Sequence, residues 1–228
     1  VKVINQRTKP TNLKVHQFPI ESFIGGFYIS EKVCDDLVDF FESNPQRQKA
    51  GRVNKRSRAD VSNNPTAEII KYQEGDRLSL VEQESKKSID MSLYPWHEDK
   101  NNETLDNYFK CLNDCIKEYE FIYPQANELN SYGPVEGLNI QKYNPGDGFY
   151  GWHHERGGIE TSSRAFAHMT YLNDVEEGGT EFWFQKLISP AKKGLTLIWP
   201  SDWTHQHRGQ VSKTETKYII TGWLNYRE

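Results

Sequence analysis

The chain of 228 residues has few cysteines, no long apolar run and little net charge. Its three cysteines, Cys34, Cys111 and Cys115, are an odd number without disulfide-framework spacing, which suggests a reducing compartment. No apolar stretch approaches the ~20 residues that a membrane-spanning helix needs. No signal peptide is visible, so we expect a cytoplasmic protein with no membrane contact. A leader trimmed ahead of Val1 stays an alternative.

The charge balance gives little sign of a nucleic-acid partner. The formal net charge is −4 and the pI is near 6.0, whereas binding to phosphates needs a positive surface. One basic run departs from this balance: Arg47, Lys49, Arg52, Lys55, Arg56 and Arg58. It lies in the polar, irregular region 44–101, and so long a loop in a compact domain is usually functional or disordered. A solvated surface loop explains the run equally well.

The first half of the chain predicts short strands and two helices. Short strands are expected within 14–29, and Ser30 can cap a helix that carries Val33, Leu37, Phe40 and Phe41 on one face. A second helix is expected from about Glu103 to Tyr119, where apolar residues form a stripe. Both apolar faces need a sheet to cover.

From Gly137 onward the pattern becomes that of β-strands. Strands are expected at 138–143, 165–172, 195–199 and 218–224, separated by Gly-rich turns, one of them at 176–179. Many short strands with such turns indicate a jelly roll. We therefore predict a mainly β fold with flanking α-helices and a double-stranded β-helix (jelly-roll) core. The length fits one domain, 1–228, with helical support in 1–130 and the core in 131–228.

A candidate metal site lies in the last third of the chain. A strand places residues i and i+2 on one side, so His153 and Glu155 can converge on one ion while His154 points away. A third ligand must come from a distant segment, and His205 and His207 have the same parity. Two imidazoles and one carboxylate are typical of non-haem Fe(II) oxygenases. A lone His-x-Glu is common by chance, however, so this pair needs the support of the other residues.

The run from Gln141 to Trp223 resembles the 2-oxoglutarate- and Fe(II)-dependent dioxygenases, most closely their prolyl 4-hydroxylase branch. In that branch a Lys or Arg follows the distal His ligand by ten residues and binds the far carboxylate of 2-oxoglutarate, and a Trp often follows six residues later. His207, Lys217 and Trp223 reproduce this spacing, and His205 does not. The resemblance thus implies that His153, Glu155 and His207 bind the metal and that Lys217 completes the catalytic set.

Other residues take their expected roles from the same resemblance. Tyr143, ten residues before His153, would contact 2-oxoglutarate, and Thr180 and Trp223 would also lie at the co-substrate. Tyr150 and Arg164 occupy positions where the family has substrate-contacting residues.

One position departs from the family pattern. The family usually has Asp where this chain has Glu155, which is one methylene longer, so its carboxylate must fold back or its backbone must lie farther from the metal. A carboxylate at this position still counts against a halogenase.

The resemblance implies the function. The expected reaction is hydroxylation of an unactivated C–H bond, most closely that of peptidyl proline, with release of succinate and CO2. The implied cofactors are Fe(II), 2-oxoglutarate and O2, with ascorbate as a candidate reductant. The implied partner is a proline-containing protein or peptide, over which part of 44–95 would fold as a lid; the oligomeric state stays open.

Two alternatives remain at this stage. The basic run favours a dioxygenase that demethylates nucleic acid with the same cofactors. Glu155 favours a non-catalytic binding module that keeps the fold.

Overall fold

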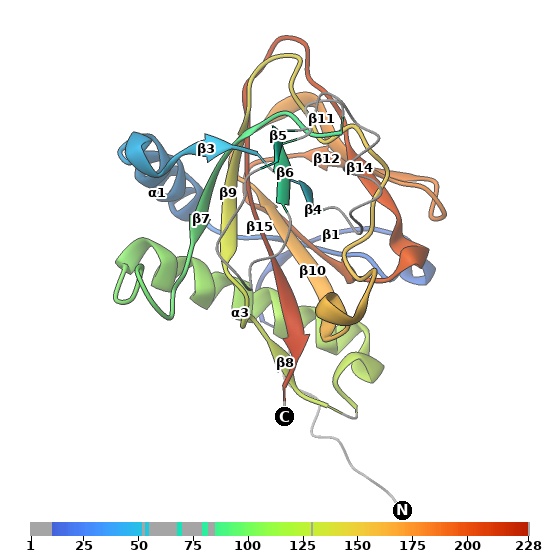
Figure 1. Cartoon of the computed structure of the whole chain (residues 1–228). Helices are drawn as coiled ribbons and strands as arrows, with labels where there is room; N and C mark the ends of the chain where they lie inside the picture. Colours follow the sequence, from blue (N-terminus) through green and yellow to red (C-terminus); the bar gives the residue numbers. More distant parts are fainter. Residues whose placement is uncertain are drawn as a thin grey trace, which may run out of the picture.

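The computed structural model describes residues 11–51, 53–54, 68–69, 79–81, 85–128 and 130–227. Within these residues the main sheet has nine strands in the order β1-β2-β13-β10-β15-β9-β7-β3, with β8 paired to β15 (Figure 1). Their bounds are β1 (Lys14–His16), β2 (Gly25–Tyr28), β3 (Lys49–Ala50), β7 (Ile89–Leu93), β8 (Tyr132–Gly133), β9 (Leu138–Tyr143), β10 (Arg164–Tyr171), β13 (Leu195–Pro200) and β15 (Lys217–Tyr226).

Two smaller sheets complete the strands of the described residues. One has the order β12-β11-β14, with β11 (Val175–Phe182), β12 (Leu187–Ala191) and β14 (His207–Gly209). The other joins β4 (Val53–Asn54), β6 (Ser79–Val81) and β5 (Glu68–Ile69). The pairings given for the main sheet and for these two sheets are antiparallel, as in a jelly roll.

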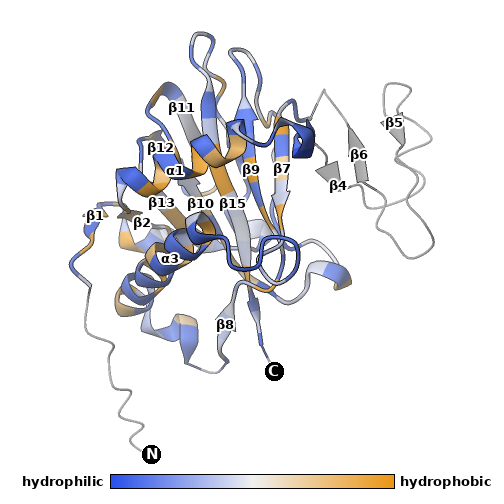
Figure 2. Ribbon diagram, turned by 90° about the vertical axis from the view of Figure 1, so that its left-hand side faces the viewer, coloured by the Kyte–Doolittle hydropathy of each residue, from blue (hydrophilic) through white to orange (hydrophobic). Residues whose placement is uncertain are grey.

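In the described part of the chain, two α-helices cover one face of the main sheet: α1 (Glu31–Glu42) and α3 (Glu103–Ile122) (Figure 2). Both sit where the sequence predicts a helix. Asn102 caps α3 by accepting hydrogen bonds from the backbone N–H groups of Thr104 and Leu105. Ser30 holds the N-cap position of α1 as predicted, but its side chain makes no capping hydrogen bond. Short 3-10 helices lie at η1 (Ile20–Ser22), η2 (Pro45–Arg47), η3 (Pro124–Asn127), η4 (Ile159–Thr161) and η5 (Trp203–His205).

Strand β10 is buried on both faces and divides the core in two. Its Phe166 joins the cluster that α1 and α3 form against the sheet, where Leu37 and Leu112 are fully or almost fully buried. Its Ala167, Met169 and Tyr171 point the other way, into a second cluster. That second cluster also includes Tyr143 and Phe182, from β9 and β11. It forms the interior of the jelly roll, and the candidate site lies beside it.

The prediction of a mainly β fold with flanking helices is confirmed, and the four expected strands correspond to β9, β10, β13 and β15. The predicted turn at 176–179 is wrong, because these residues belong to β11. The strand changes register between Val175 and Thr180, which marks a bulge. The bulge requires glycine, since a Cβ on Gly179 would lie 1.8 Å from the carbonyl oxygen of Ser189. The two adjacent glycines of this bulged strand had been interpreted as a sign of a turn.

Half of the residues in 44–95, part of which was predicted to form a lid, lie outside the described residues, as do Arg52, Lys55, Arg56 and Arg58 of the basic run. Arg47 is described, and its guanidinium forms an ion pair with Asp99 at 2.6 Å. That member of the basic run is therefore already engaged by a carboxylate. Of the helices in the described ranges, none combines the length and the apolar character needed to cross a bilayer.

Candidate metal centre

A β-bridge brings the two halves of the candidate site together. The backbone N–H of His153 donates to the carbonyl oxygen of His207 at 3.0 Å, and the N–H of His207 donates back to His153 at 2.8 Å. His207 opens β14, which pairs with the end of β11 at Phe182. The segment around His153 forms this single bridge rather than the regular strand that the alternation argument assumed. The site thus lies at one end of the β12-β11-β14 sheet.

The side chains of His153, Glu155 and His207 converge on one point. Oε1 of Glu155 lies 3.6 Å from Nε2 of His153 and 3.4 Å from Nε2 of His207. The three ligand atoms lie within 4.8 Å of one another. In the described part of the chain, no other group of three His, Cys, Asp or Glu side chains meets this condition. The sequence prediction named these same three residues, and their role as ligands stays a prediction.

Both imidazoles are oriented for metal binding by backbone carbonyls. Nδ1 of His153 lies 3.0 Å from the carbonyl oxygen of Gly151, and Nδ1 of His207 lies 2.9 Å from that of His205. A carbonyl oxygen only accepts hydrogen bonds, so each Nδ1 carries a proton, and Nε2 is the ring nitrogen left to bind a metal. Such an Nδ1–H···O=C bond is the usual support of a metal-binding histidine. The donor set of two imidazole nitrogens and one carboxylate oxygen therefore fits Fe(II).

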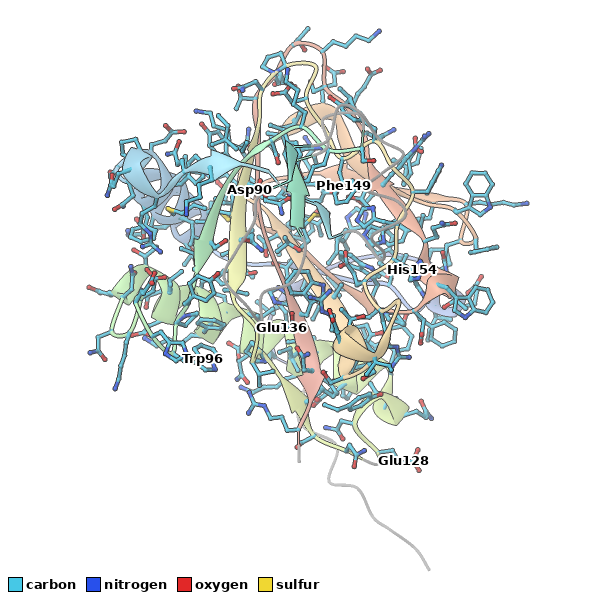
Figure 3. The ribbon with its side chains drawn as sticks, viewed as in Figure 1. Asp90, Trp96, Glu128, Glu136, Phe149 and His154 are labelled. Atoms are coloured by element: carbon cyan, nitrogen blue, oxygen red, sulfur yellow. The ribbon has the colours of Figure 1, made fainter. Side chains whose placement is uncertain are left out.

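His153 is held in a stack with Phe149, which Figure 3 labels. The two rings are nearly parallel, with an interplanar angle of 7° and centroids 3.7 Å apart. Burial and the neighbouring His207 lower the pKa of His153 to about 3. Its ring is therefore neutral at physiological pH, which is the protonation state that binds a metal.

Hydrogen bonds fix both the side chain and the backbone of Glu155. Oε2 accepts a hydrogen bond from Nε1 of Trp223 at 2.8 Å, and the backbone N–H donates to Ser201 at 3.1 Å. The carbonyl oxygen of Glu155 accepts a bond from Arg164 at 3.0 Å. Burial alone would raise the pKa of Glu155, but the neighbouring imidazoles of His207 and His153 and the guanidinium of Arg164 outweigh it and hold the pKa below its usual value. The side chain is therefore a carboxylate.

Lys217 is a buried cation whose bonds go to backbone oxygens. Its Nζ donates to the carbonyl oxygens of Gly178 at 2.9 Å and Gln210 at 2.7 Å, and it lies 5.2 Å from the ring centre of Tyr143. Among the residues that the structure describes, no carboxylate lies within ion-pair distance of it. Burial lowers the pKa of Lys217 to about 8. An anion that entered here would supply the missing partner.

Hydroxyl groups lie in the same interior as Lys217. Thr180 pairs in register with Gly209, where an added Cβ would lie 3.6 Å from Nζ of Lys217. The hydroxyl of Thr180 lies 2.7 Å from that of Tyr171. The hydroxyl of Tyr143 donates to Gln141 at 2.5 Å. The predicted co-substrate residues Tyr143, Thr180 and Lys217 thus lie near one another.

The remaining predicted residues have clear positions. Trp223 contacts Glu155, as described above. Arg164 is buried, with its guanidinium 3.6 Å from the ring centre of Trp223, and it binds Glu136 through bonds of 2.8 and 2.6 Å. The hydroxyl of Tyr150 donates to the carbonyl oxygen of Gly146 at 2.9 Å. Their predicted contacts with substrate and co-substrate remain predictions.

His205 does not join the metal group. Its ring nitrogens lie 2.9 Å from the carbonyl oxygen of Ser22 and 3.0 Å from the hydroxyl of Thr204. The spacing argument that favoured His207 therefore agrees with the geometry.

Sequence reasoning missed three residues that support the site. Phe149 stacks on His153, Glu136 holds Arg164, and Lys86 is a buried cation that pairs with Asp90 at 2.6 Å and lies 5.8 Å from the Phe149 ring centre. Glu136 and Lys86 come from segments outside the motif, and no local pattern marks them. Phe149 had a weak signal, because an aromatic residue four positions before a ligand can reach its ring.

Comparisons with known proteins agree with this geometry. Residues 138–225 match the family model of the 2OG-Fe(II) oxygenase superfamily. A comparison with curated proteins found no match. The solved structure of a viral collagen prolyl hydroxylase from Paramecium bursaria Chlorella virus 1, in its 2OG complex, is similar with a TM-score of 0.57 and 16% identity, covering 89% of this chain and 95% of that one. A Pseudomonas putida prolyl-4-hydroxylase is similar with a TM-score of 0.58 and 12% identity, covering 91% and 94%.

At these identities the likeness to the solved structures shows a common fold, and the match to the family model covers residues 138–225. The matched segment contains Lys217 as well as His153, Glu155 and His207, whose ligand atoms converge. Fe(II), 2-oxoglutarate and O2 are the cofactor and co-substrates that this family implies. Residues 138–225 match the 2OG-Fe(II) oxygenase superfamily, and the chain has the fold seen in solved prolyl 4-hydroxylases.

Proposed function

We propose that the chain is a dioxygenase that hydroxylates proline in a peptide or protein, with residues 131–228 as the catalytic core and 1–130 as its support. The observation that carries the proposal is the convergence of His153, Glu155 and His207 beside the buried cation Lys217. Three ligands on one side of a metal leave positions for a 2-oxo acid and O2. The three free cysteines support a cytoplasmic location.

The protein's part in the reaction follows from these contacts. Nε2 of His153, Nε2 of His207 and Oε1 of Glu155 would hold Fe(II). The bound metal would supply O2 activation coupled to decarboxylation of 2-oxoglutarate to succinate and CO2. The protein orients the reactants and excludes water, because the ligands lie at the edge of the buried interior.

Lys217 would bind the far carboxylate of 2-oxoglutarate. An ion pair is much stronger in a buried site than in water, because water screens the charges less there. Thr180 and Tyr171 offer hydroxyl groups near the same end of the interior. The buried cation thus gains a partner only when the co-substrate is bound, and this gain favours binding of a dicarboxylate over a monocarboxylate.

A row of aromatic side chains beside the metal centre supports a proline-rich substrate. Trp183 and Phe184 are each 55% exposed, and Trp203 is 63% exposed. The ring centre of Trp183 lies 4.8 Å from that of Trp152, and the ring centre of Phe184 lies 6.1 Å from that of Trp203. We call these four residues the aromatic rim.

The aromatic rim is continuous with the metal centre. Trp152 precedes His153 in the chain, and Trp183 follows Phe182, which pairs with His207. The turn between β11 and β12 lies beside η5 in Figure 1, and the backbone N–H of Trp183 donates to Gln206 at 2.9 Å. Proline-rich segments adopt the polyproline II conformation and dock on exposed aromatic rings. The rim would hold the residues that flank the proline to be hydroxylated.

Among the described residues of the basic run, Arg47 pairs with Asp99, so its charge is already engaged by a carboxylate. The test of the proposal is to incubate the Fe(II) protein, 2-oxoglutarate and O2 with proline-rich peptides and to measure the peptide mass. A gain of one oxygen atom, absent from matched peptides in which alanine replaces proline, is the expected result. Oxidation of methylated DNA instead would favour the demethylase alternative. No oxidation of either, despite tight metal binding, would favour the binding module.

A further inference from the structure

We propose that Trp223, braced by Arg164 and Glu136, fixes the carboxylate of Glu155 so that a single oxygen faces the metal. This device would let the chain use glutamate where its relatives usually have the shorter aspartate. The proposal rests on the proposed function, since it takes His153, Glu155 and His207 as the metal ligands.

The two oxygens of Glu155 have different partners. Oε1 lies 3.6 and 3.4 Å from Nε2 of the two histidines, whereas Oε2 accepts the 2.8 Å bond from the indole of Trp223. An indole N–H only donates, so this bond suits the ionised carboxylate. A free glutamate side chain samples several rotamers, and a hydrogen bond to one oxygen selects among them. Trp223 thus limits how Glu155 can present Oε1.

Trp223 is itself held in place. It lies in β15, where it pairs with Ala167 of β10. The guanidinium of Arg164 stacks on its ring at 3.6 Å, a contact in which a cation and an aromatic face attract each other. Arg164 is in turn fixed by two bonds to Glu136, and Glu136 accepts a further bond from Asn225 at 2.8 Å. The indole is therefore held through the ring face on which Arg164 stacks.

Arg164 also acts on Glu155 directly. Its Nη1 donates to the backbone carbonyl oxygen of Glu155 at 3.0 Å and lies 3.8 Å from Oε2. The guanidinium of Arg164 thus fixes the backbone of Glu155 and adds a positive charge near its carboxylate. It also supports Trp223, whose indole donates the hydrogen bond to Glu155. This arrangement makes Arg164 a positioning residue.

The arrangement suits glutamate and not aspartate. An aspartate at this position would bring its carboxylate back toward the main chain by about one C–C bond, ~1.5 Å. From a backbone fixed by Ser201 and Arg164, the shorter side chain could not reach the metal and the Trp223 indole together. The proposal therefore predicts that the family's usual aspartate weakens metal binding in this chain.

The test is a double-mutant cycle on metal affinity. Isothermal titration of metal-free protein with Co²⁺ would compare the wild type, Glu155→Asp, Trp223→Phe and the double variant. Loss of a residue that orients a metal ligand typically costs 10- to 100-fold in affinity, so each single variant should bind Co²⁺ at least about tenfold more weakly. In the Glu155→Asp background, Trp223→Phe should weaken Co²⁺ binding much less than it does in the wild type. The reason is that Glu155→Asp has already broken the hydrogen bond between residues 155 and 223.

Two controls separate positioning from a general loss of structure. Trp96→Phe changes a tryptophan that packs on Phe109 of α3, and it should leave Co²⁺ affinity unchanged. The visible spectrum of bound Co²⁺ should shift in Trp223→Phe and not in Trp96→Phe. Melting temperatures of the metal-free proteins would show whether each variant is folded.

The outcomes separate this proposal from the proposed function. A wild type that binds no Co²⁺ would overturn both. A wild type that binds Co²⁺, with Glu155→Asp binding as tightly or more tightly, would keep the metal site and overturn the positioning role. Losses that simply multiply in the double variant would overturn it as well, because they would show that Trp223 acts independently of the Glu155 carboxylate.

Discussion

His207 donates a hydrogen bond from Nδ1 to the backbone carbonyl oxygen of His205, 2.9 Å away, while the ring of His205 turns to the carbonyl oxygen of Ser22. His205 and His207, which have the same parity in the sequence, therefore have different roles. The ring of His207 keeps Nε2 for a metal, and the ring of His205 connects η5 to the segment that contains η1. His205 orients the predicted ligand His207 only through its main chain.

The first prediction is that His207→Ala removes metal binding and His205→Ala does not. Substitution of His207 deletes a ligand, so Co²⁺ affinity should fall by several orders of magnitude. Substitution of His205 keeps the backbone oxygen that His207 needs, so affinity should change less than about threefold. It should lower the free energy of unfolding by about 1–3 kcal/mol, because buried polar groups lose their partner. Titration with Co²⁺ and urea unfolding check both parts, and the reverse ranking would assign the ligand to His205.

The second prediction concerns pH and 2-oxoglutarate. The pKa of Lys217 in the free protein is lowered to about 8 by burial, and a bound carboxylate would raise it. Below pH 8 the Lys217 side chain is charged with or without the ligand, so its titration should not make the affinity for 2-oxoglutarate depend on pH. Above pH 8 binding must also take up a proton, so affinity should fall by up to tenfold per pH unit. Anaerobic titration of the Fe(II) protein at pH 7 and pH 9 measures the change.

Lys217→Arg is the matched control for this pH effect. A guanidinium stays protonated throughout this range, so the decline above pH 8 should disappear in the variant. A wild type and a variant with the same pH profile would show that another group controls binding.

The third prediction concerns the aromatic rim. Trp183→Ala and Trp203→Ala should each raise the KM for a proline-rich peptide by about tenfold, because exposed aromatic anchors often contribute more than ~1 kcal/mol to binding. The kcat should stay nearly constant, since neither side chain belongs to the metal centre. Trp96→Ala is the control, because Trp96 is similarly exposed, at 46%, and packs on α3 instead. Equal KM values for all three variants would show that the aromatic rim does not bind the peptide.

The fourth prediction concerns stability in acid. His168 is fully buried between the main sheet and α3, where Nδ1 lies 3.3 Å from the hydroxyl of Tyr108. Burial lowers its pKa from 6.5 to about 3. Between these values the unfolded chain binds a proton that the folded protein does not. Stability therefore falls as the pH drops below 6.5, by about 1.4 kcal/mol per unit from this residue.

Urea unfolding of metal-free protein at pH 6.0 and pH 4.5 measures that dependence. His168→Leu removes the group that titrates and keeps an apolar side chain in the core. The variant should lose less stability on acidification than the wild type, by about 1.4 kcal/mol per pH unit. An unchanged slope would mean that His168 binds its proton in the folded protein.

Much of the fold and of the site could be predicted from the sequence, because both depend on local patterns. Alternation and Gly-rich turns marked β9 and β10, and an apolar stripe marked α3. The His153-x-Glu155 pair and the spacing from His207 to Lys217, which resembles that of the family, marked the candidate site, although His153 lies in an isolated bridge and not in the regular strand that alternation assumes. The bulge in β11 was missed because Gly179 is needed by a close contact with Ser189 of β12 that no local pattern reveals.

The support around the ligands could not be predicted for a similar reason. Glu136, Phe149 and Lys86 act on the site through contacts that depend on how distant segments pack. Arg164 and Trp223 were recognised by position alone, which suggested contacts with substrate and co-substrate. Only the three-dimensional arrangement shows that both also hold Glu155.

The most direct test of the account is succinate formation from 2-oxoglutarate by the Fe(II) protein in the presence of O2. The account predicts that a proline-rich peptide stimulates succinate formation by the wild type and that His207→Ala forms none, whereas His205→Ala keeps most of the activity. Succinate formation by His207→Ala at the wild-type rate would contradict the assignment of His207 to the metal centre.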